Sequence, residues 1–172
     1  MSNKAQEEFI SKAKKEIQQK IKTENKALDE LSNEKKELMT AIQGYENFHH
    51  DLRHFFIESM QDFVVAEEDL PKYFRSNIND VYQNYAQIRR DAIDEINTLK
   101  KYINHCKKEI NSNKRTLKFY RSQYMDSDFF DECLPLVEIY QKKIELYQEN
   151  GKLTIKTIEK LEKIVEKLKG WE

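Results

Sequence analysis

The chain has 172 residues, of which 38% are hydrophobic and 35% charged, with only 3 Gly and 2 Pro. Turns depend heavily on Gly and Pro, so this composition excludes sandwiches, barrels, Rossmann-type sheets and glycine-rich phosphate loops. The 30 basic and 31 acidic residues give a net charge of -1, which lacks the positive field of a non-specific nucleic-acid-binding protein. A small number of long helices remains as the expected architecture.

The first predicted helix covers residues 3–68. Two mostly apolar seams repeat every seven positions from Ile10 to Phe63. A heptad pattern sustained over this length is typical of a coiled coil. The helix is expected to end before Pro71, because proline lacks a backbone donor and disfavours helix in the residue before it.

Two further helices are predicted, over residues 72–122 and 128–169. The short polar side chains at 126–128 mark the break between them, because such residues satisfy the free amides of a helix start. Gly151 lies inside the third helix and is a potential stop. The heptad register is continuous on both sides of this glycine, so the pattern favours one helix over two.

The predicted fold class is all-α: an elongated antiparallel three-helix coiled coil, formed by a long helical hairpin plus a third helix, in a single domain of residues 1–172. We expect residues 3–20 to extend beyond the rest of the bundle. Phe9, Ile10 and Ile17 would then form an apolar seam without an intramolecular partner. A protein partner or a homo-oligomer is therefore expected to cover these three residues.

No run of 18 apolar residues is present, and the N-terminal residues lack the apolar core of a signal peptide. The sequence therefore predicts a cytoplasmic protein with no membrane span. Cys106 and Cys133 have no metal-binding or redox spacing and are expected to be reduced packing residues. No catalytic motif is present, so we expect neither enzymatic activity nor a cofactor.

A row of histidines and glutamates is the one candidate for metal binding. His50 and His54 lie one helical turn apart, and Glu46 and Glu58 extend the row in both directions. Such a set can chelate a divalent metal. The row falls on the outer face of the predicted coiled coil, so the pattern favours a solvated polar face over a metal site.

The segment 100–121 is strongly basic, with Glu109 as its sole acid. Basic side chains interleaved with aromatic rings can bind phosphates and stack on bases. The acidic segment 126–138 could instead fold back and neutralise the basic one, so pairing within the protein or with a partner protein is favoured over nucleic acid. The residues of the nucleic-acid alternative are Lys107, Lys108, Lys114, Arg115, Lys118 and Arg121.

Aromatic residues make up 11% of the chain, which is high for a coiled coil. Many lie near the end of the predicted hairpin, and large rings are common anchors of protein interfaces. Phe55, Tyr73 and Phe74 are the ones we expect to contact a partner.

Tyr124 and Asp128 follow the second predicted helix in a Y-x-x-x-D spacing. A helical hairpin followed by this pair resembles the WXG and LXG families of Gram-positive type VII secretion, including the small helical accessory proteins that dock on LXG toxins. The resemblance covers residues 1–128 and implies a secretion adaptor or targeting chaperone, exported by a signal-peptide-independent route.

Together these patterns predict a non-enzymatic helical adaptor or chaperone-like protein that binds a partner protein through its coiled-coil faces. A secretion-associated or toxin-associated accessory protein and an inhibitor that acts by occlusion both fit this description. The alternative is a nucleic-acid-associated protein that uses the basic segment 100–121.

Overall fold

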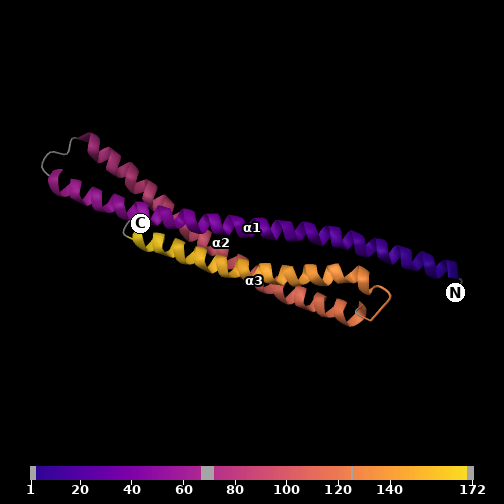
Figure 1. Ribbon diagram of the computed structural model, residues 1–172. Coiled ribbons are helices and arrows are strands. Elements are labelled where there is room, and N and C mark those ends of the chain that lie inside the picture. Colours follow the sequence, from indigo (N-terminus) through magenta and orange to yellow (C-terminus); the bar gives the residue numbers. More distant parts are fainter. Residues whose placement is uncertain (1–2, 67–71, 125, 170–172) are drawn as a thin grey trace. The chain divides into compact units, whose positions relative to one another are not determined.

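A computed structural model describes the backbone of residues 3–66, 72–124 and 126–169, and the side chains of these residues outside 53–84. The chain forms three helices, α1 (Asn3–Ala66), α2 (Lys72–Tyr124) and α3 (Phe130–Lys167) (Figure 1). No strand occurs among the residues so described. The all-α fold of three helices packed against one another is therefore confirmed.

The turn between α2 and α3 explains why the third helix starts later than expected. The amide of Phe130 donates to the carbonyl of Ser127 at 3.2 Å, and the Ser127 amide donates to the carbonyl of Tyr124 at 3.2 Å. The Ser127 hydroxyl accepts from the amide of Phe129 at 3.2 Å. The polar residues of this segment therefore build the turn itself, and the helix follows it.

The chain divides into two compact units, each built from parts of all three helices. Unit 1 comprises residues 1–37 and 104–152, and unit 2 comprises residues 38–103 and 153–172. The expectation of a single domain over residues 1–172 stays a prediction.

The core of unit 1 joins α2 and α3. Leu136 is fully buried at its centre, and the rings of Tyr120 and Tyr140 stack with their centroids 5.7 Å apart. Ile17 and Ile21 of α1 pack against this cluster. Its buried members are Leu117, Tyr120, Cys133, Leu136, Val137, Tyr140 and Ile144.

The core of unit 2 is aliphatic and receives side chains from all three helices. Leu161 and Ile164 of α3 are each 2% exposed, and Leu52 of α1 is 3% exposed. Full burial of such a side chain contributes about 1.5–3 kcal/mol relative to exposure. The buried members are Leu52, Ala92, Ile96, Leu99, Ile158, Leu161, Ile164 and Leu168.

In unit 1, α1 and α3 run in the same direction. Lys14 pairs with Glu132 and Lys35 pairs with Glu149, each with nitrogen and oxygen 2.7 Å apart. The residue numbers rise together along both helices, so the two helices are parallel.

The second helix runs against the third in the same unit. Tyr120 stacks on Tyr140, and the ring of His105 lies edge-on to that of Tyr147 with centroids 6.1 Å apart. Between these two contacts the residue number falls along α2 and rises along α3, so α2 is antiparallel to α3. Successive helices therefore run in opposite directions in unit 1, as the predicted antiparallel three-helix arrangement requires.

The expectation that residues 3–20 lack an intramolecular partner is wrong for part of that segment. Lys14 forms an ion pair with Glu132, and Ile17 packs against the core of unit 1. The reason is the parallel pairing, which brings the first turn of α3 beside this part of α1. Ile10 is half-buried, and Phe9 is 69% exposed.

Helix α3 continues through Gly151 without interruption. A Cβ atom added at Gly151 would lie 3.9 Å from the Cβ of Cys106, which is an ordinary van der Waals contact. A methyl group can therefore be accommodated between α2 and α3 at this point.

We predict that Gly151→Ala raises the free energy of unfolding by about 0.5–1 kcal/mol, because alanine loses less backbone freedom on folding than glycine. Urea denaturation measures the change. Gly44→Ala on α1 is the control. Nothing lies within 4 Å of the added atom there, so only the higher helix propensity of alanine changes the free energy of unfolding. If Gly151→Ala lost stability while Gly44→Ala gained it, the added methyl group would not fit beside Cys106 as the structure indicates.

Candidate functional site

Only Glu46 and His50 of the predicted metal row have side chains that the structure describes. Glu46 accepts a hydrogen bond from Lys160 with nitrogen and oxygen 3.3 Å apart, and the His50 side chain is 68% exposed. His54 and Glu58 lie outside the described side chains. Among the side chains that the structure describes, no three His, Cys, Asp or Glu residues are grouped as metal ligands.

The three aromatic candidates at the hairpin end, Phe55, Tyr73 and Phe74, also lie outside the described side chains and stay predictions. Tyr124 is half-buried in an aromatic cluster at the end of α2, with its ring centroid 5.7 Å from that of Tyr120. Asp128 is exposed. Tyr124 therefore has a packing role, and its role in secretion stays a prediction.

Both cysteines are buried and neither forms a disulfide bond, as expected of reduced packing residues. Burial raises the pKa of the Cys133 thiol, and the neighbouring Glu132 raises it further. The thiolate is the reactive form of cysteine, so Cys133 is poorly suited to nucleophilic chemistry.

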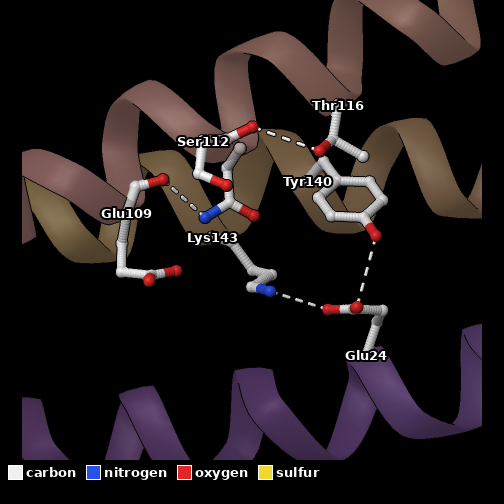
Figure 2. Close-up of polar contacts among 7 residues, drawn as sticks. Glu24, Glu109, Ser112, Thr116, Tyr140 and Lys143 are labelled. Atoms are coloured by element: carbon white, nitrogen blue, oxygen red, sulfur yellow. Dashed lines mark hydrogen bonds and ion pairs between the residues drawn. The ribbon is translucent and has the colours of Figure 1, made fainter.

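A polar contact between α1 and α3 is the most enclosed ionic feature of unit 1. The Lys143 ammonium lies 2.7 Å from the Glu24 carboxylate, and their side chains are 11% and 17% exposed. The Tyr140 hydroxyl donates to the same carboxylate at 3.2 Å. Figure 2 shows both donors directed at Glu24 across the gap between the helices.

Burial and the Glu24 carboxylate raise the pKa of the Tyr140 hydroxyl well above its ordinary value. The hydroxyl therefore stays protonated and remains a donor to Glu24. Glu24 occupies a seam position of the heptad repeat, where a single polar residue selects the register of a helix pair.

A second buried contact selects the same register. The side-chain amide of Asn150, which is fully buried, donates to the backbone carbonyl of Leu31 at 3.2 Å. This pair and the pair of Glu24 with Lys143 have the same sequence separation of 119 residues. Sliding α1 along α3 would break both contacts and leave buried polar groups unpaired.

We predict that Glu24→Leu and Lys143→Met each lower the free energy of unfolding by about 1–3 kcal/mol, because each leaves a buried charge unpaired. The double variant should lose less than the sum of the two. Urea denaturation of the four proteins gives the coupling energy.

The exposed pair of Lys35 with Glu149 is the matched control, and it should couple by less than about 1 kcal/mol. Its side chains are 37% and 50% exposed. Strict additivity at Glu24 and Lys143 would mean that their contact does not hold α1 on α3.

An open groove of about 770 Å³ lies between α2 and α3 in unit 1. Leu117 and Ile144, both members of the unit 1 core, give the groove an apolar floor. We call it the basic groove, and its lining residues are Lys114, Leu117, Lys118, Arg121, Ser122, Gln141, Ile144 and Glu145. Among the described side chains, no residue of α1 lines it.

The α2 wall of the basic groove is positively charged. Lys114, Lys118 and Arg121 are exposed, and none of the three forms an ion pair within the part of the chain that the structure describes. Lys107 is exposed one heptad before Lys114 on the same stripe of α2. Glu145 is the single acid among the lining residues.

Among the described residues, the acidic segment 126–138 forms no ion pair with segment 100–121, so pairing between the two segments stays a prediction. Glu132 pairs with Lys14 of α1, and the hydrogen bond from Lys14 lowers the pKa of Glu132. No other acid of the segment forms an ion pair among the described residues. The reason is that Cys133 and Leu136 occupy the side of α3 that packs into the core, so Asp131 and other acids face outward.

Three of the six residues proposed for nucleic acid thus come together in the basic groove. Lys108 and Arg115 are exposed elsewhere on α2. The sequence patterns did not predict that Gln141, Ile144 and Glu145 of α3 form the other wall. For the α2 wall, a signal was available in the sequence. A basic residue recurs every seven positions beside the α2 seam, at Lys107, Lys114 and Arg121, and residues at such positions select partner helices.

Comparison with protein-family models, with curated proteins and with solved structures finds no match. Among the helices as described, none carries an apolar stretch able to cross a bilayer. The geometry of the basic groove is therefore the main guide to function. Cations above an apolar floor suit the binding of an anionic amphipathic segment.

Proposed function

We propose that this chain is a non-enzymatic protein-binding module and that its basic groove takes an acidic amphipathic helix. The observation that carries the proposal is a set of three exposed cations that form no ion pair among the described residues. They are Lys114, Lys118 and Arg121, and they lie beside the apolar floor of Leu117 and Ile144. Apolar side chains of the partner would cover the floor, and its carboxylates would meet the cations.

A helix is the occupant that suits the groove best. Two antiparallel helices with a third on one side leave room for a fourth, which completes a bundle. Lys107, Lys114 and Arg121 recur every seven residues over about 21 Å of α2. A partner helix with acids at its flanking heptad positions would meet all three.

Nucleic acid is the second candidate, since the same cations can bind phosphates. The net charge of -1, the apolar floor and Glu145 favour a protein helix over a phosphate backbone. Aromatic rings beside the cations would support stacking on bases. Tyr120 and Tyr124 pack in the core of unit 1, whereas Phe119 is 52% exposed and is the ring that the nucleic-acid candidate would use.

The wider role that we propose is that of a cytoplasmic adaptor or chaperone. The resemblance to type VII accessory proteins supports a helical client, and an inhibitor that acts by occlusion would use the same groove. The segment before Lys14, with Phe9 exposed and Ile10 half-buried, is a further candidate surface for that client.

A designed peptide tests the groove directly. The probe is a synthetic amphipathic helix of about 21 residues, with leucine at the seam positions and glutamate at the flanking ones. We predict that the wild-type protein binds this peptide and that the triple variant Lys114→Glu, Lys118→Glu, Arg121→Glu weakens binding by about a hundredfold or more. Fluorescence anisotropy of the labelled peptide gives both dissociation constants.

Two controls isolate the groove. The variant Lys15→Glu, Lys22→Glu, Lys26→Glu makes the same charge change at exposed positions of α1 and should bind as the wild type does. A peptide with lysine in place of glutamate should not bind. Equal binding by both triple variants would refute the groove as the site. Binding of a labelled single-stranded RNA that persists at moderate salt would favour the nucleic-acid candidate.

A further inference from the structure

We infer that a second copy of this chain occupies the basic groove, which names the partner of the site proposed above and rests on that proposal. The inference starts from a second surface in unit 1, on the first turns of α3. We call it the acidic stripe, and its residues are Phe130, Asp131, Leu134 and Glu138, all exposed.

The acidic stripe combines apolar and acidic side chains. Phe130 and Leu134 are 36% and 37% exposed and lie one helical turn apart. Asp131 and Glu138 flank them, and neither forms an ion pair among the described residues. Asp126 and Asp128 add further exposed acids in the preceding turn. This surface has the chemistry of the occupant that the basic groove requires.

The two surfaces are complementary in charge, and neither forms an ion pair with the other among the described residues, although Lys14 of α1 lies near enough to Asp128 and Asp131 for a favourable charge interaction. Segment 126–138 contains no basic residue, and Lys114, Lys118 and Arg121 have no acidic partner in the described structure. The net charge of -1 means that two copies do not repel each other strongly at long range. A near-neutral chain with segregated charges favours association with itself.

The placement of the surfaces suits a two-fold pairing. Phe130, Leu134 and Glu138 are each four residues apart, so they lie along one stripe of α3. The same stripe continues to Gln141 and Glu145, which line the basic groove. If two copies meet antiparallel on this face, the acidic stripe of each lies against the basic groove of the other. The same contact is then made twice, as an isologous interface requires.

The apolar residues fit the same arrangement. Leu134 of one copy would cover the floor formed by Ile144 and Leu117 of the other copy. The carboxylates of Asp131 and Glu138 would face the α2 wall, where the cations stand exposed. Burial of Leu134 supplies the apolar contact, and the charges select the partner and its orientation.

Charge reversal with complementation tests the inference on the full-length protein. The basic variant carries Lys114→Glu, Lys118→Glu and Arg121→Glu, and the acidic variant carries Asp128→Lys, Asp131→Lys and Glu138→Lys. Sedimentation velocity gives the oligomeric state of each protein, and circular dichroism checks that each is as helical as the wild type.

We expect the wild type to be a dimer whose dissociation constant rises between about 0.1 M and about 0.5 M salt, because screening weakens exposed charge pairs. Each variant alone should be a monomer. An equimolar mixture of the two should again form a dimer. In the mixed pair the reversed groove of the basic variant meets the reversed stripe of the acidic variant, and the unchanged groove and stripe meet each other, so both contacts are complementary in charge. The variant Lys15→Glu, Lys22→Glu, Lys26→Glu should remain a dimer.

A monomeric wild type overturns the inference, as does a dimer that persists in both reversed variants. A monomeric wild type that still binds the glutamate peptide through the groove would refute self-association alone. A monomer that binds neither its own copy nor the peptide would refute the proposed function as well.

Discussion

The buried ion pair between Glu24 and Lys143 fixes the register of α1 on α3 in unit 1. It lies in a seam that is otherwise largely apolar. If either helix shifted along the other, a buried charge would lose its partner. Apolar side chains alone specify the register weakly, because a shift of α1 by one heptad again places apolar seam positions opposite one another. The ion pair, Tyr140 and Asn150 remove that freedom.

Once α1 is fixed on one side of α3, the opposite side of the α2 and α3 pair stays open. The residues of α3 that contact α1, such as Lys143, differ from those that line the basic groove, such as Gln141 and Glu145. Placement of α1 thereby decides where the fourth helix that we propose can bind. The charges divide in the same way, because Glu132 pairs with Lys14 of α1, whereas Lys114, Lys118 and Arg121 form no ion pair among the described residues.

Much of the fold was predictable because helix periodicity and punctuation are local properties of the sequence. The three helices, their order and the continuity of α3 at Gly151 follow from heptads and from the scarcity of Gly and Pro. The pairing of Ile17 and Lys14 with the start of α3 was missed, because it depends on the register between helices distant in sequence. The groove escaped prediction for the same reason, since Ile144 and Leu117 meet only after folding.

The register of α1 on α3 can be measured by zero-length cross-linking of amines to carboxylates, followed by mass spectrometry of the monomer. The ion pairs of Lys14 with Glu132 and of Lys35 with Glu149 place the reacting atoms 2.7 Å apart. The account predicts both of these links within one chain. Links of Lys14 to Glu149 and of Lys35 to Glu132 would instead show antiparallel helices and contradict it.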